Sequence, residues 1–144
     1  MIVIICGSRN FNNYDVVEKA IKKSGFNITT VYSGGAKGAD ALGEAWAKLN
    51  NIPIVQFPAK WNDLKQANAM IKTRENPWTH KKERYCHNAG ILRNEEMLNS
   101  GAEAVIAIQE EVTPGTQHMI KIAKQKGIPV YIYQKEDQDY DYQF

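Results

Sequence analysis

Short runs of apolar, largely β-branched residues recur along the chain and alternate with longer amphipathic stretches. Continuous apolar runs of this length are typical of strands buried on both faces of a parallel sheet. The alternation of such strands with helical stretches predicts an α/β fold, a single Rossmann-like domain of about five mostly parallel strands with helices on both faces. The predicted strands are residues 2–6, 28–33, 52–57, 104–108 and 128–133.

The amphipathic stretches predict the helices that connect these strands. Residues 14–24 and 39–49 each place their apolar side chains on one stripe at helical spacing. A third helix is predicted over residues 87–97, with Ile91 and Leu98 facing the core. A fourth helix opens after the strand at residues 104–108.

Residues 59–86 interrupt this rhythm. Trp61 and Trp78 are scattered there among basic residues without a sustained period, so the segment is predicted to be a long insertion or a lid over a site, and a short helix within it stays an open alternative. The last ten residues are acidic and lack a core pattern. The predicted organisation is therefore one nucleotide-binding domain over residues 1–134, with the insertion 59–86, followed by an acidic tail at 135–144.

Composition sets limits on the kind of protein. The chain has 144 residues, a formal net charge of +2 and two cysteines, Cys6 and Cys86. A charge this small does not by itself require a polyanionic partner, and two unrelated cysteines fit a reducing compartment. No run approaches the ~18 apolar residues that a membrane span needs. We therefore expect a cytoplasmic protein, without a membrane partner.

Two glycine-rich turns carry the first indication of function, because each follows a predicted strand and opens a predicted helix. Such a turn presents unpaired backbone N–H groups at the positive end of the helix dipole, where an anion can bind. Arg9 adds a charged fork that suits phosphate, although a solvated loop cation is the alternative. The residues expected to hold phosphate in these turns are Gly7, Ser8, Arg9, Ser33, Gly34, Gly35, Ala36, Gly38 and Asp40. Neither turn matches the P-loop or the Gly-x-Gly-x-x-Gly motif.

Four motifs in this order resemble the YspA-like branch of the SLOG superfamily of Rossmann-like proteins. They are Gly7-Ser8-Arg9, then Ser33-Gly34-Gly35-Ala36 with Gly38-Ala39-Asp40, then Ala89-Gly90 with Arg93-Asn94 and Met97, and finally Gly115-Thr116. The resemblance covers nearly the whole chain apart from the insertion and the tail. Similar proteins are frequent in bacteriophage genomes, so the expected location is a bacterial cytoplasm, or that of the host if a phage encodes the chain.

The resemblance implies a ligand pocket at the carboxyl ends of the strands, where open α/β sheets also place their ligands. It adds Arg93, Asn94, Gly115 and Thr116 to the expected ligand contacts. The related LOG phosphoribohydrolases carry a catalytic glutamate two residues after the equivalent Gly-Thr, and here that position is His118. A carboxylate supports N-glycosidic hydrolysis better than an imidazole does. Candidate catalytic residues are therefore His118, Thr116, Glu110 and Glu111.

Three functions stay open at this point. The first is non-catalytic binding of a nucleotide or a nucleotide-derived ligand, as a sensor or a sequestering protein. The second is a nucleotide N-glycosidase of the phosphoribohydrolase type. The third is single-stranded DNA binding, because the turn at residues 33–40 also resembles the Rossmann domain of DNA-processing protein A and the insertion mixes aromatic with basic residues.

Cofactors and partners are less defined by the sequence. His80, Cys86 and His87 have no recognised zinc-ligand spacing, so no metal site is predicted. Mg²⁺ bound through Asp40 together with a polyphosphate stays an alternative, since an aspartate in the first turn of a helix needs no ion. The resemblance also implies a homo-oligomer, a dimer or a tetramer.

Overall fold

A parallel sheet of five strands forms the centre of the protein, with strand order β3-β2-β1-β6-β7. A computed structural model describes residues 1–134, so the predicted acidic tail at 135–144 lies outside the described residues. The predicted α/β fold with five parallel strands is confirmed. The strands of this sheet are β1 (Ile2–Gly7), β2 (Thr30–Ser33), β3 (Ile54–Gln56), β6 (Ala104–Gln109) and β7 (Val130–Gln134).

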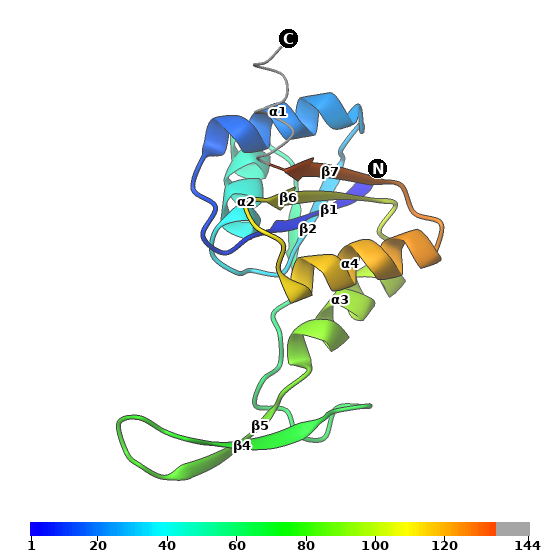
Figure 1. Cartoon of the computed structure of the whole chain (residues 1–144). Coiled ribbons are helices and arrows are strands. Elements are labelled where there is room, and N and C mark those ends of the chain that lie inside the picture. Colours follow the sequence, from blue (N-terminus) through cyan, green and yellow to red (C-terminus); the bar gives the residue numbers. More distant parts are fainter. Residues whose placement is uncertain (135–144) are drawn as a thin grey trace.

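Four helices cover the two faces of the sheet. Helices α1 (Tyr14–Ser24) and α2 (Ala39–Leu49) lie on one face, and α3 (Ala89–Asn99) and α4 (Pro114–Gln125) lie on the other (Figure 1). The predicted helices 14–24 and 39–49 are confirmed at both ends. Among residues 1–134 there is no helix whose length and apolar character would let it cross a bilayer.

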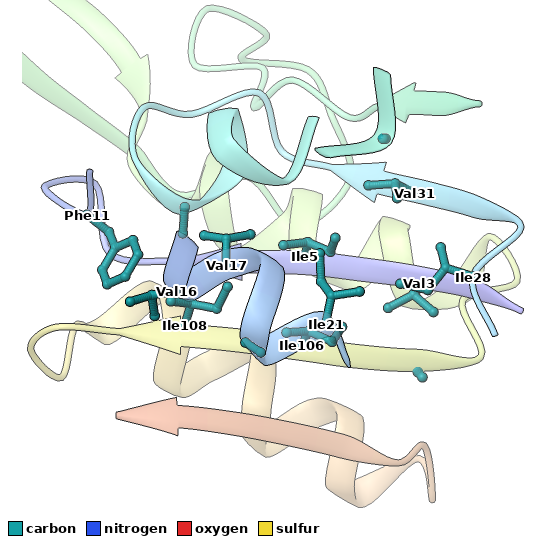
Figure 2. Packing of buried hydrophobic residues seen from close by; sticks show 14 residues of the cluster. Val3, Ile5, Phe11, Val16, Val17, Ile21, Ile28, Val31, Ile106 and Ile108 are labelled. Carbon is teal, nitrogen blue, oxygen red and sulfur yellow. The ribbon is translucent and has the colours of Figure 1, made fainter. Parts of the chain in front are cut away.

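Alternating side chains of each central strand feed two separate hydrophobic cores. Val3 and Ile5 of β1 pack with Val17 and Ile21 of α1 on one face, as Figure 2 shows. Ile4, between them in the chain, packs on the other face with residues of α3 and α4 such as Met97. All three β1 residues are fully buried, as expected for a strand covered on both sides.

Three predicted strands begin later than the sequence suggested, at residues 30, 54 and 130 instead of 28, 52 and 128. The backbone N–H groups of Ile52 and Ile128 donate to the carbonyls of Ala47 and Ala123, at 2.8 and 3.0 Å. These apolar residues therefore complete the ends of α2 and α4 before the chain enters the sheet. Ile91 is also a correction, because it is 43% exposed while Leu98 is buried as predicted.

The insertion contains a β-hairpin, and the alternative of a short helix within it was wrong. Strands β4 (Ile71–Glu75) and β5 (Lys82–Cys86) pair antiparallel and project away from the sheet beyond α3 (Figure 1). Both strands carry polar side chains on both faces, so their sequences lack the alternation that marks a strand buried on one side.

The first two strand-to-helix turns pack directly against each other. The N–H of Ala39 donates to the carbonyl of Ser8 at 3.1 Å. Between them Gly38 has φ +77°, and a Cβ there would stand 2.3 Å from the Ser8 carbonyl oxygen. Only glycine combines this backbone conformation with this close approach.

We expect Gly38→Ala to lower the free energy of unfolding by about 2–4 kcal/mol, because it adds backbone strain and a clash with the Ser8 carbonyl. Gly25→Ala is the matched control: Gly25 has φ +71° but open space where a Cβ would be. It should cost only about 1 kcal/mol. Urea denaturation of both variants measures the difference, and equal losses would show that the close approach contributes nothing.

Candidate functional site

A cavity of about 550 Å³ opens at the carboxyl ends of β1 and β6. These strands are neighbours in the sheet, and the chain runs outward from them in opposite directions, through β2 and β3 on one side and β7 on the other. Ligands of open α/β sheets bind at this kind of switch point. The cavity is lined by Cys6, Gly7, Arg9, Asn10, Ala36, Asp40, Trp61, His87, Gly90, Ile91, Arg93, Asn94, Met97, Glu111, Thr113, Pro114, Gly115, Thr116 and Met119.

Three helices begin at this cavity, and none has a side-chain cap. The N-cap residues of α2, α3 and α4 are Gly38, Asn88 and Thr113, and no side-chain hydrogen bond caps any of these helices. Helix α1, which contributes no lining residue, is capped by Asn13, whose Oδ1 accepts from the N–H of Val16 at 3.4 Å. The first-turn N–H groups of α3 and α4 therefore keep capacity for an anionic ligand, whereas in α2 the N–H of Ala39 already donates to the carbonyl of Ser8.

The side chain of Asn88 is used by the insertion instead of the helix. Its Oδ1 accepts from the N–H of Met70 at 2.8 Å and from the thiol of Cys86 at 3.2 Å, and its Nδ2 donates to the carbonyl of Asn68 at 3.0 Å. The N-terminus of α3 is open to the cavity because its natural cap anchors the base of the insertion.

Arg93 ties α3 to the ends of β2 and β3. Its guanidinium donates to the carbonyl of Gly34 at 2.9 Å and to that of Phe57 at 3.4 Å. A Cβ on Gly34 would stand 2.5 Å from this guanidinium and 2.9 Å from the Asp40 carboxylate. The glycine therefore makes room for a close group of one arginine and one aspartate. Burial lowers the pKa of Arg93, and the charge of Asp40 opposes that effect.

Asp40 is a buried carboxylate in the cavity wall, 5% exposed. Burial raises its pKa to about 6, although the N–H of Ala36, which donates to Oδ2 at 3.2 Å, and the positive charge of Arg93 favour the ionised form. At neutral pH this carboxylate is mostly charged and accepts hydrogen bonds. It suits a hydroxyl or amino donor of a ligand better than a phosphate.

Arg9 differs from Arg93 in being exposed, and no hydrogen bond within residues 1–134 engages its guanidinium. It lines the cavity directly after β1. A free guanidinium beside uncapped helix ends is the arrangement that binds phosphate by paired hydrogen bonds.

Several expected contacts lie behind the cavity wall. The hydroxyl of Ser8 donates to the carbonyl of Glu111 and accepts from the N–H of Glu110, so it holds the loop after β6. The hydroxyl of Ser33 donates to Glu44 at 2.7 Å and accepts from the N–H of Gly35 at 3.1 Å. Both serines are buried and organise the turns. Ser8, Ser33, Gly34, Gly35 and Gly38 are not among the lining residues.

The candidate catalytic residues are divided by the structure. Thr116 and Glu111 line the cavity, whereas His118 and Glu110 do not. The ring of His118 lies 3.3 Å from the amide of Asn94, and burial lowers its pKa. The amide of Asn94 also donates to the carbonyl of Gly115 at 3.2 Å, so Asn94 links α3 to the first turn of α4.

Two aromatic residues of the cavity wall were not expected from the sequence. Trp61 and His87 stand at the two ends of the insertion and line the cavity. The indole of Trp61 lies over Gly90, at 3.7 Å from where a Cβ would be. The tryptophan within an irregular segment was the available signal, but a sequence cannot show which way a loop folds back.

Acidic and metal-binding side chains are not clustered here. Among residues 1–134 no three His, Cys, Asp or Glu side chains are close enough together to hold a metal ion.

The arrangement defines a Rossmann-like α/β domain with a cavity at the sheet switch point. Residues 1–63 match the family described as YspA, cpYpsA-related SLOG family, so the resemblance inferred from the four motifs is confirmed over this part. The chain is also similar to the Gene 61 protein of Mycobacterium phage D29, 29% identical over 137 residues, which covers 89% of this chain and 92% of that protein. No solved structure matches the chain.

The two comparisons support different parts of the description. The family match includes β1 to β3 and the two glycine-rich turns that follow β1 and β2. It indicates a role in binding or modifying a nucleotide-related ligand. The phage relative agrees with the expected link to bacteriophage genomes.

Asp40 makes stability depend on pH in a testable direction. Because its pKa is raised from 3.8 to about 6, the folded protein binds this proton more tightly than the unfolded chain. The free energy of unfolding therefore falls as the pH rises from about 4 to about 6, by about 3 kcal/mol at most.

We expect Asp40→Asn to raise the free energy of unfolding by about 1–3 kcal/mol at pH 7.5 and to leave it nearly unchanged at pH 4, because asparagine resembles the protonated carboxyl. Urea denaturation at both pH values measures this. The control is Asp15→Asn on the exposed first turn of α1. An equal effect of Asp40→Asn at both pH values would contradict the raised pKa.

Proposed function

We propose that the protein binds a nucleotide or nucleotide-derived ligand in the cavity at the switch point, as a sensor or a sequestering protein. The observation that carries this proposal is the convergence of two uncapped helix N-termini, those of α3 and α4, with the free guanidinium of Arg9 on one cavity. The volume of about 550 Å³ lies within the range of small-molecule sites.

The phosphate end of the ligand is assigned to Arg9 and the first turn of α4. Thr113 and Thr116 bond to each other through their hydroxyls at 3.0 Å, and this turn contains no acidic residue. Phosphate oxygens there would accept from the N–H groups of Gly115 and Thr116 and from Arg9.

The sugar is assigned to the side of Asp40. A phosphate next to this carboxylate would be repelled, whereas a ribose hydroxyl can donate to it. The charge of Arg93 favours the ionised form of Asp40, and the Arg93 guanidinium stays largely engaged with backbone carbonyls. Binding of Mg²⁺ between Asp40 and a polyphosphate is the alternative, and binding that requires Mg²⁺ would support it.

The base is assigned to the aromatic wall formed by Trp61 and His87. The side chain of Ile91 also lines the cavity. An aromatic base stacked on an indole gains about 1–3 kcal/mol, and an apolar wall excludes water from its faces. A cavity whose wall carries an indole as well as cationic side chains fits a nucleotide better than a sugar phosphate.

Hydrolysis of a nucleotide N-glycosidic bond is the second candidate, favoured by the presence of Glu111 and Thr116 in the cavity wall. A carboxylate at this place can activate water for attack at the anomeric carbon, with the base leaving. Released base in the assay below, lost in Glu111→Gln with binding retained, would establish this candidate.

The phosphate assignment is tested with a panel of nucleoside mono-, di- and triphosphates, NAD and ADP-ribose, read by thermal shift and by chromatography of the recovered ligand. We expect at least one ligand to stabilise the fold, and Arg9→Ala to weaken its binding by about 10- to 100-fold, since a hydrogen bond to a charged group contributes about 1.5–3 kcal/mol. Lys37→Ala removes an exposed cation from a neighbouring turn outside the cavity and is the matched control. No stabilisation by any ligand would contradict the proposed function.

The base assignment is tested with Trp61→Leu. We expect this variant to bind the stabilising nucleotide about 10-fold more weakly and the matching ribose phosphate unchanged, because only the base contacts the indole. Trp78→Leu changes an 88% exposed tryptophan outside the cavity and serves as the control. Equal losses for nucleotide and ribose phosphate in Trp61→Leu would refute the stacking assignment.

A further inference from the structure

The hairpin of β4 and β5, residues 71–86, forms an arm that stands apart from the rest of the protein (Figure 1). Its two strands pair only with each other, in a two-stranded sheet separate from the central one. Nine of its ten strand residues are exposed or only partly buried, and only Cys86 at its base is fully buried. An isolated two-stranded sheet of this kind adds little to the stability of the fold. Its side chains are therefore available to a partner.

The tip of the arm is a defined turn that presents a tryptophan. Oδ1 of Asn76 accepts from the N–H groups of Trp78 at 2.8 Å and Thr79 at 3.1 Å, and the N–H of Asn76 donates to the carbonyl of Lys81 at 2.8 Å. Trp78 is 88% exposed and follows Pro77. A large apolar ring held outward at the end of a polar arm marks a contact point.

Positive charge lies on both faces of the arm. Residues 71–86 contain five Lys and Arg against two Glu. The strand register places Lys72 and Arg74 on one face and Lys82 and Arg84 on the other. Arg74 also stacks on the ring of Tyr85, with its central carbon 4.9 Å from the ring centroid.

Both carboxylates of the arm have partners near the tip. Oε1 of Glu83 accepts from the amide of Asn76 at 2.9 Å, and Oε1 of Glu75 lies 3.5 Å from Nδ1 of His80. In the described residues no carboxylate forms an ion pair with Lys72, Lys82 or Arg84. The register sets Glu83 opposite Arg74 and Glu75 opposite Lys82, so each face has two cations and one carboxylate and keeps a net positive charge.

We propose that this arm binds duplex DNA by entering a groove tip first, with Trp78 against the base pairs. A groove has a phosphate backbone on each side, so a ribbon between its walls needs cations on both faces, as this arm has. The major groove, about 12 Å wide, admits a two-stranded ribbon. An aromatic ring at the tip of such a ribbon can contact the base edges there, as apolar side chains contact the thymine methyl group. A flat anionic bilayer or a single DNA strand would contact only one face of the arm, so cations on the other face would have no partner there.

The arm and the ligand cavity are distinct sites. Trp78 and the four strand cations are not among the residues that line the cavity. The base of the arm joins the cavity wall only through neighbouring residues, since Trp61 and His87 lie just outside the paired strands. DNA binding is therefore expected to persist when the cavity is altered.

The test uses the whole protein and a fluorescently labelled 20-base-pair duplex, with binding read by anisotropy over a series of salt concentrations. The two face variants are Lys72→Gln with Arg74→Gln, and Lys82→Gln with Arg84→Gln. We expect each to weaken binding about 10-fold or more, and to lower the slope of log Kd against log salt by about 2, since each phosphate contact contributes about 0.9. The matched control removes two exposed cations from α1 and α2, Lys19→Gln with Lys48→Gln, and should bind like the wild type.

Further variants separate the roles within the arm. Trp78→Ala should weaken duplex binding about 10-fold with an unchanged salt slope, because it removes contact without removing charge. Arg9→Ala should leave DNA binding unchanged. Every arm variant should unfold at the same temperature as the wild type. A loss of DNA binding in such a variant then cannot be due to a folding defect.

Four outcomes would overturn the proposal. These are no duplex binding at 50 mM salt, a loss in only one of the two face variants, tighter binding to the same single strand than to the duplex, and binding to anionic vesicles in place of DNA. Self-association in gel filtration that disappears in Trp78→Ala without any DNA binding would likewise show that the arm contacts a second copy of the chain.

Discussion

The contact of Arg93 with the ends of two strands holds the site together. One guanidinium bonds to the carbonyls of Gly34 and Phe57, and its charge stands beside Asp40. Gly34 and Phe57 directly follow β2 and β3. Arg93 belongs to α3, which lies on the face of the sheet opposite to α1 and α2. One partly buried cation therefore links α3 to the glycine-rich turn after β2 and to the end of β3. Removing that cation would leave Asp40 buried without its nearest positive charge, a costly arrangement in a protein interior.

The helix N-termini at the cavity are uncapped because the side chains at their N-cap positions bond to other groups or are absent. Asn88 would ordinarily cap α3, but it bonds to the insertion, and Thr113 bonds to Thr116. Gly38 has no side chain with which to cap α2. The unused caps of α3 and α4 would each contribute roughly 1 kcal/mol, whereas a glycine at the N-cap, as in α2, costs only about a few tenths of that. Natural proteins accept such losses at functional sites more often than elsewhere, because a preformed binding surface needs donors that the fold has not satisfied.

Sequence patterns predicted the sheet and its helices because burial on both faces leaves continuous apolar runs, as in β6. They failed for the arm, where polar side chains on both faces produce no period. The glycine-rich turns were found because glycine marks close approaches that other residues cannot make. The hydroxyls of Ser8 and Ser33 were predicted to contact a ligand. In the structure they donate to Glu111 and Glu44 within the protein. Distant partners of this kind, 103 residues apart for Ser8 and Glu111, leave no local trace in a sequence.

The separateness of the arm also affects how this protein can change over time. Substitutions in the central sheet disturb two cores at once, since neighbouring side chains of β1 face opposite layers. Substitutions between Lys72 and Tyr85 disturb neither core, and only the base of the arm is tied to α3 through Asn88. The packing of the domain therefore places little constraint on the outer arm, and only contact with a partner limits changes there. Relatives that meet a different partner should keep the same domain while carrying arms of different sequence.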